Sequence, residues 1–124
     1  MSSNYDYAKK ILQQIWNSYQ TIQNLKDQPG DLDILKKELL KINGFFNVME
    51  KKLEPDSFQS RDLLELKPKI TNFLNNYYFV QEIDTMSPLY ADDKDRLKNM
   101  RLKILEAFQD RRLIDKIEEL LQEL

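Results

Sequence analysis

The sequence predicts an all-α protein: an antiparallel four-helix bundle with a fifth C-terminal helix or a helical extension. Apolar residues recur at alternating spacings of three and four through most of the chain, as on one face of a helix. The two glycines and four prolines fall mostly where this pattern pauses. With 124 residues, 41% of them hydrophobic and 32% charged, the chain has the length of one domain, residues 1–124, and can bury one modest core.

The first expected helix has one apolar face and one face rich in Gln, Asn and Lys. Its seam is formed by Tyr5, Ala8, Leu12, Ile15, Tyr19 and Ile22. Trp16 lies beside this seam, where boundary packing is the simpler explanation than a binding anchor. The segment DQPGD, residues 27–31, ends the helix, because Pro29 lacks an N–H and Gly30 favours a reversal. The next helix should therefore return antiparallel to the first.

The second expected helix has the most regular pattern. Its seam is an unbroken heptad repeat of Leu32, Leu35, Leu39, Ile42, Phe46, Met49 and Leu53. Gly44 lies on the opposite side, where it weakens the helix by about 1 kcal/mol relative to alanine. Either another backbone approaches Gly44 closely or the glycine is simply tolerated, and we favour the second interpretation.

A loop, EPDSFQS at residues 54–60, separates this helix from a third seam. That seam comprises Leu63, Leu66, Ile70, Phe73, Tyr77 and Val80. It keeps its phase across Pro68, which predicts a kinked helix or a short helix followed by one with Pro68 in its first turn, and we favour the latter. Ser87 and Pro88 can open another helical turn. Asp92, Asp93 and Asp95 suit the start of a fourth helix that runs to about Phe108.

The segment FQDRRLIDKIEELL, residues 108–121, breaks the pattern of the fourth helix. Its aliphatic stripe lies about 135° around a helix from Leu97, Met100 and Ile104. We therefore expect the helix direction to break, or its exposed face to change, between Phe108 and Leu113. If four helices close the core, this C-terminal stripe is surplus and forms a partner-binding surface. Its predicted members are Arg111, Arg112, Leu113, Ile114, Ile117, Leu120, Leu121 and Leu124.

A fifth helix folded onto its own bundle explains the stripe equally well.

Secondary surface candidates come from two other patterns. Three consecutive aromatics in NNYYFVQEI, residues 75–83, make Tyr78 and Phe79 a possible stacking patch, although packing against a neighbouring helix is the simpler interpretation. Lys94, Lys98 and Arg101 form a basic strip with Arg112, although nearby acids favour an ordinary mixed-charge surface.

The composition excludes most enzyme classes. The chain has no histidine and no cysteine, which rules out Ser-His and Cys-His nucleophile pairs, histidine zinc sites, thiolate chemistry and disulfides. Two isolated glycines cannot build a phosphate-binding loop. Adjacent acids such as Glu118 and Glu119 point in different directions on a helix, so solvated faces explain them better than a metal or acid–base site. We therefore expect no enzymatic activity, metal or cofactor.

Charge and hydropathy limit the partners and the location. A net charge of −2 lacks the basic excess of a general nucleic-acid binder. The N-terminus shows no signal-peptide pattern, and no apolar run approaches the length of a membrane span. These features predict a cytoplasmic protein.

Three segments carry a resemblance to a known family. AKKILQQIWNSYQ, LDILKKELLKIN and ITNFLNNYYF, at residues 8–20, 32–43 and 70–79, resemble the bacteriocin immunity proteins of Gram-positive bacteria, which are small cytoplasmic four-helix bundles. The resemblance covers roughly residues 7–105. It implies a non-enzymatic protector that acts from the cytosolic side of a toxin and its membrane receptor. It also implies that the C-terminal region, here residues 111–124, sets which toxin is recognised.

The sequence thus predicts a protein-binding role, with immunity as its most specific form. The expected partner is a protein, either a membrane receptor complex or a second copy of the chain, and no small-molecule substrate is expected. Two alternatives remain: a structural subunit of a helical oligomer or larger complex, and a nucleic-acid accessory protein that uses the basic strip.

Overall fold

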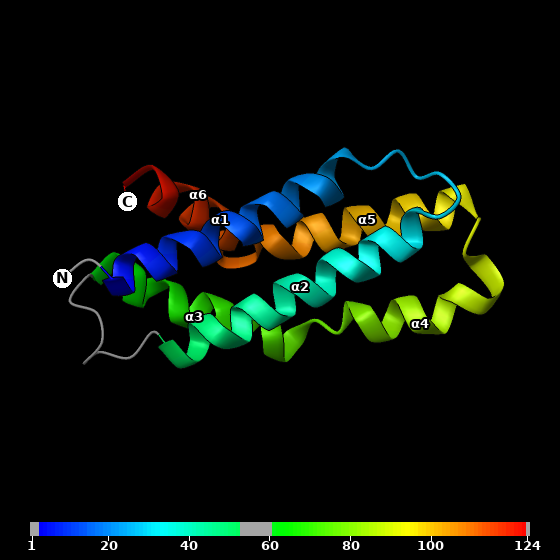
Figure 1. Cartoon of the computed structure of the whole chain (residues 1–124). Coiled ribbons are helices and arrows are strands. Elements are labelled where there is room, and N and C mark those ends of the chain that lie inside the picture. Colours follow the sequence, from blue (N-terminus) through cyan, green and yellow to red (C-terminus); the bar gives the residue numbers. More distant parts are fainter. Residues whose placement is uncertain (1–2, 53–60, 124) are drawn as a thin grey trace.

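The computed structural model describes residues 3–52 and 61–123, and all the regular secondary structure in these ranges is helical. The helices form four antiparallel rods, as the all-α prediction requires (Figure 1). The first two rods are single helices, α1 (Ser3–Asn24) and α2 (Asp31–Lys52). The third and fourth rods are each broken once.

The link between α1 and α2 reverses the chain as the sequence predicts. Asp27 and Gly30 adopt positive φ angles of 62° and 93°, which turn the backbone out of the helix. The Asp31 carboxylate accepts a hydrogen bond from the backbone N–H of Gln28 at 2.9 Å. α2 therefore runs back along α1 (Figure 1).

The third rod consists of α3 (Arg61–Asn76) and α4 (Phe79–Tyr90), and it breaks at Tyr77 and Tyr78. The favoured prediction, a short helix followed by one with Pro68 in its first turn, is wrong, because Pro68 lies inside the single helix α3. Pro68 is exposed, so water can satisfy the carbonyl that its missing N–H leaves unpaired. Pro88 likewise lies in the last turn of α4, rather than opening a new turn.

The fourth rod begins at α5 (Lys94–Gln109) and continues through a short turn, η1 (Asp110–Arg112), into α6 (Leu113–Glu123). Asp93 caps α5 by accepting a hydrogen bond from the backbone N–H of Arg96 at 3.1 Å, which confirms an acidic start for this helix. Arg111 and Arg112 have positive φ angles of 54° and 58°. The predicted break between Phe108 and Leu113 is thereby confirmed.

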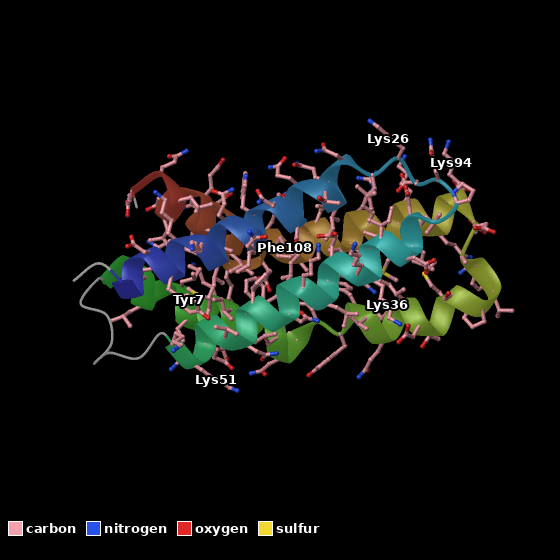
Figure 2. All side chains as sticks on the ribbon, viewed as in Figure 1. Tyr7, Lys26, Lys36, Lys51, Lys94 and Phe108 are labelled. Atoms are coloured by element: carbon pink, nitrogen blue, oxygen red, sulfur yellow. The ribbon has the colours of Figure 1, made fainter. Side chains whose placement is uncertain are left out.

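The core runs along the centre of the four rods. Phe108, labelled in Figure 2, lies in this centre with ring centroids 4.8 Å from Phe73 and 6.3 Å from Phe46. The predicted seams are buried from Ala8 to Ile22 in α1, from Leu32 to Met49 in α2 and from Leu63 to Phe73 in α3. The side chains of Tyr5 and Leu53 lie outside the described part of the chain.

Two smaller predictions about packing are also confirmed. Trp16 is partly buried at the edge of the core, with its ring centroid 5.6 Å from that of Tyr19. A Cβ atom at Gly44 would meet nothing within 4 Å, so no backbone approaches this glycine and it is simply tolerated.

In the part of the chain that the structure describes, no helix is long and apolar enough to span a lipid bilayer.

Candidate protein-binding site at the α3–α4 break

The C-terminal aliphatic stripe lies inside the bundle. α6 packs against α1, α3 and α5, and four members of the stripe are at most 4% exposed. These are Leu113, Ile114, Ile117 and Leu120. Leu121 is partly buried against the same core, and Leu124 lies outside the described residues.

The prediction that these aliphatic side chains form a partner-binding surface is therefore wrong for the four buried residues. The physical reason is the turn at Arg111 and Arg112. Their left-handed backbone conformation ends α5 and re-aims the chain, so the stripe of α6 faces the same core as the stripe of α5. The alternative of a last helix folded onto its own bundle is the one that the structure shows.

The two arginines of the predicted surface remain exposed. Lys69 of α3 holds their turn in place by donating a hydrogen bond from Nζ to the backbone carbonyl of Arg111 at 2.5 Å. Arg112 forms an exposed ion pair with Asp115, with 3.5 Å between Nε and Oδ2. This part of the predicted site is thus accessible to a partner.

The basic strip on α5 is only partly available. Lys94 and Lys98 are exposed. Lys94 lies near Lys26 at one end of the bundle, where Figure 2 labels both residues. Arg101 instead donates two hydrogen bonds to Asp27, at 2.8 and 3.0 Å. The two side chains are 14% and 9% exposed, so Arg101 joins α5 to the α1–α2 link and is not the surface candidate that the sequence suggested.

The pairing of Asp27 with Arg101 shifts the pKa values of both groups. Hydrogen bonds from Arg101 lower the pKa of Asp27, partial burial opposes this shift, and the charges of Arg101, Lys98 and Lys94 add to it. The pKa of Arg101 is raised mainly by the hydrogen bonds to Asp27. Both groups are therefore charged over the neutral range, and the pair is a fixed structural contact.

The consecutive aromatics separate into three environments. Phe79 is 3% exposed and packs into the core, so its assignment as a surface candidate is wrong. Tyr77 is partly buried, with its ring stacked on that of Phe79 at 5.5 Å between centroids. Tyr78 is 56% exposed, and its hydroxyl donates to the backbone carbonyl of Asn75 at 2.6 Å. The interpretation of neighbour packing thus holds for Phe79, and the surface interpretation holds for Tyr78.

Three surface hollows meet at this break in the third rod. A groove of about 840 Å³ runs between α4 and α5 and is lined by Tyr77, Tyr78 and Met86 among others. A second, of about 450 Å³, lies between α2 and the break and also includes Tyr77 and Tyr78. A third, of about 490 Å³, lies between the end of α3 and Arg111. Asn75 or Asn76 lines every one of them. Residues 75–78 therefore define the candidate site, which we call the break site.

A hydrogen-bond network fixes the break site to the turn of the fourth rod. Asp110 accepts a hydrogen bond from the Tyr77 hydroxyl at 2.8 Å and another from the Asn72 amide at 2.9 Å. Both bonds lower the pKa of Asp110, and the bond from Tyr77 has the larger effect. The bond between Tyr77 and Asp110 is also the main cause that raises the pKa of Tyr77, and burial of Tyr77 raises it further. These hydrogen bonds therefore join the break in the third rod to the turn in the fourth rod.

The chemistry of the break site suits binding. Its exposed groups are the phenol of Tyr78 and the carboxamides of Asn75 and Asn76, which can donate and accept hydrogen bonds and offer apolar contact area. Across residues 3–52 and 61–123, no three acidic side chains gather as a metal-ion site would require.

Sequence reasoning located Tyr78 but missed the break that exposes it. The consecutive asparagines before Tyr77 were an available signal, because asparagine has low helix propensity and favours turns. The Asp27–Arg101 pair had no local signal, since 74 positions separate its members. Comparison of the chain with protein-family models, with curated proteins and with solved structures finds no match.

Proposed function

We propose that this chain is a non-enzymatic protein-binding protein, and most specifically a protector of the bacteriocin-immunity type that its sequence resembles. The proposal combines the resemblance at residues 8–20, 32–43 and 70–79 with the antiparallel four-rod architecture. The absence of histidine and cysteine from the sequence supports a role without covalent chemistry. In this role the expected partner is a toxin, or a toxin bound to its membrane receptor, on the cytosolic side.

The exposure of Tyr78 beside two of the three hollows is the observation that carries the proposal. The break leaves a large aromatic side chain 56% exposed although Phe79 beside it is buried. Tyrosine and asparagine are typical of protein-recognition surfaces, because a rigid aromatic ring gives contact area and a carboxamide adapts its hydrogen bonds. The fold holds Tyr77 with Asp110, so the position of the break is fixed before any partner binds.

The location of recognition differs from what the resemblance implies. In that family the C-terminal region sets which toxin is recognised, but here four of its aliphatic residues are buried: Leu113, Ile114, Ile117 and Leu120. Of the predicted surface, Arg111 and Arg112 are exposed, and Arg111 lines a hollow shared with Asn75 and Asn76. We therefore place recognition on the break site, with the turn of the fourth rod at its edge.

A protection assay tests the proposal. The chain is expressed in a bacteriocin-sensitive Gram-positive strain, which is then challenged with a panel of purified bacteriocins. We expect survival against at least one toxin, and loss of that survival in Tyr78→Ala. Tyr7→Ala is the matched control, because Tyr7 is 46% exposed and lies at one end of the bundle, away from the break (Figure 2). Equal sensitivity of expressing and empty cells to the whole panel would refute immunity.

The structural-subunit alternative predicts a different mass in solution. Its main support was the surplus stripe, and that stripe is used inside the bundle. We expect sedimentation or light scattering to give the mass of one chain, 14.9 kDa. A stable dimer or larger species would favour the subunit instead.

The nucleic-acid alternative depended on a continuous basic strip. Arg101 is now paired with Asp27, and the net charge of the chain is −2. We expect no salt-dependent retention on DNA or RNA.

A further inference from the structure

Four cationic residues gather where α3 meets the turn of the fourth rod. Lys67 and Lys69 belong to α3, and Arg111 and Arg112 form the end of η1. We call these four residues the arginine corner. The hydrogen bond from Lys69 to the carbonyl of Arg111 joins its two sides directly.

The backbone at Arg111 and Arg112 is strained, and the turn that they form does not require arginine at either position. Arg111 and Arg112 both adopt φ angles near +55°, at 54° and 58°. This left-handed conformation costs roughly 1–2 kcal/mol for a residue with a Cβ atom, whereas glycine adopts it freely. Glycine or asparagine would form the same turn with less strain. Strained backbone of this kind is typical of functional sites, so it favours a functional role for the side chains of the two arginines.

The positive charge of the corner is only partly neutralised. Among the described residues, the guanidinium of Arg111 contacts no acceptor. Lys69 donates its hydrogen bond to a neutral carbonyl, so this contact does not neutralise the charge of its ammonium group. Arg112 has only the exposed pair with Asp115, of a kind worth about 0–1 kcal/mol.

The acids that border the corner already hold hydrogen bonds from the protein. Asp110 accepts from Tyr77 and Asn72, and Glu50 accepts from the hydroxyl of Thr71 at 2.6 Å. These carboxylates are therefore held by polar side chains. Asp110 also attracts Arg111 through its charge, but among the described residues no carboxylate binds the Arg111 guanidinium directly, so its donors are left to contact a ligand.

A hollow beside Arg111 can hold one or two side chains of a ligand. It encloses about 490 Å³ and is lined by Lys67, Pro68, Thr71, Asn72, Asn75, Asn76 and Arg111. No acidic residue and no aromatic ring is among these lining residues. The carboxamide of Asn75 is exposed at its rim, so a guanidinium and an amide donor face the same space. The hollow also continues into the break site through Asn75 and Asn76.

We propose that the arginine corner binds an acidic segment of the protein partner, with a carboxylate of that segment on the Arg111 guanidinium. This inference rests on the proposed protein-binding function and specifies the chemistry of the partner. A carboxylate matches the planar donor fork of arginine, and the Asn75 amide can bind the backbone or a second carboxylate. A net charge of −2 and a hollow without an aromatic stacking surface disfavour a nucleic acid as the occupant.

Titration of the full chain with a defined probe tests this inference. The probe is an acetylated, amidated tetraglutamate peptide, followed by NMR of ¹⁵N-labelled protein. We expect saturable shifts of the side-chain amides of Asn75 and Asn76 and of the Arg111 signals. A tetraglutamine peptide should cause none. Arg111→Gln should weaken binding about fivefold, the size expected for one partly exposed charged contact. Lys37→Gln, which changes an exposed cation of α2 that lines none of the three hollows, should leave binding unchanged.

A second variant separates binding from folding. Arg111→Gly relieves the strained backbone, so its melting temperature should equal or exceed that of the parent chain, while binding of tetraglutamate weakens as in Arg111→Gln. Weakened binding with retained stability would assign the effect to the guanidinium. Unchanged binding in both Arg111 variants would overturn the inference, as would shifts caused by inorganic phosphate and not by the peptide.

The two proposals fail in different ways. A chain that protects cells but shows no response to tetraglutamate would refute the acidic segment and leave protein binding intact. A chain that binds tetraglutamate through Arg111 but protects against no toxin would refute immunity and leave the corner as a binding site for acidic peptides.

Discussion

At the residue scale, Asp27 performs two structural tasks at once. Its φ of 62° turns the backbone within the link after α1, and its carboxylate accepts both hydrogen bonds from Arg101 of α5. Aspartate and asparagine adopt this left-handed conformation more readily than most residues with a Cβ atom. Asp27→Asn therefore removes the charge and retains the backbone preference, so it isolates the energetic contribution of the ion pair.

We expect Asp27→Asn to lower the free energy of unfolding by about 1–3 kcal/mol at neutral pH, because Arg101 loses a nearly buried charged partner. Urea denaturation measures the change. Asp33→Asn is the control, since Asp33 is exposed on α2. A loss no larger than that of the control would show that solvent compensates Arg101.

The same pair predicts a pH dependence. The pKa of Asp27 is lower in the folded chain than in the unfolded chain, where it is about 4. The stabilisation is therefore fully present above pH 4 and is lost as the pH falls through the folded value. We expect the difference in unfolding free energy between the parent chain and Asp27→Asn to shrink below pH 4. A constant difference at all pH values would contradict the assignment.

Core truncations test the predicted seams. Leu39→Ala and Phe73→Ala should each cost about 2–5 kcal/mol, because both side chains are at most 2% exposed. Leu40→Ala is a matched control: Leu40 is the next residue of α2, is 51% exposed and should cost within about 0.5 kcal/mol. Thermal or urea unfolding measures all three. A Leu39 variant as stable as the Leu40 variant would mean that the face of α2 is assigned wrongly.

At the element scale, the sequence predicted the helices better than their breaks. The seam of α2 could be read because a heptad repeat requires only that one face meet the core. The breaks at Tyr77 and at Arg111 depend on long-range contacts, such as Tyr77 with Asp110 and Lys69 with the Arg111 carbonyl. The aliphatic stripe of α6 was recognised correctly, but two left-handed arginines decide which way it faces. The phase change of the apolar residues predicts a break before Leu113, but it does not say in which direction the turn aims the chain.

The burial of α6 predicts the outcome of a truncation. Deleting residues 110–124 should unfold or aggregate the chain, because it removes four core side chains and exposes the surfaces of α1 and α3 that α6 covers. Circular dichroism and size-exclusion chromatography measure this. Deleting only residues 122–124 is the control, since Gln122 and Glu123 are exposed. A folded, stable 1–109 fragment would restore the stripe as a recognition surface.

At the scale of the whole molecule, the four rods share one core but α4 is attached to it most lightly. α4 packs mainly against α2 and α5, and only Phe79 and Ile83 of its residues are fully buried. Two exposed ion pairs at 2.6 Å, Lys36–Asp84 and Lys103–Glu82, join it to α2 and α5. Arg96 of α5 also stacks on the ring of Tyr90 at the end of α4. Such exposed ion pairs contribute little and are screened by salt. The segment that adjoins the break site is thus the part of the fold most able to open alone.

We expect native-state hydrogen exchange to show this directly. The amides of α4 should exchange through a partial opening that needs less free energy than global unfolding, whereas the central amides of α2 and α5 should exchange only with global unfolding. Added salt should lower the opening free energy of α4 further by screening its two ion pairs, with a smaller effect on α2. Phe79→Leu should also lower it, because a smaller side chain loosens the anchor of α4 in the core. If α4 exchanges with the same free energy as α2, then the bundle unfolds as one unit and the break site is as rigid as the core beneath it.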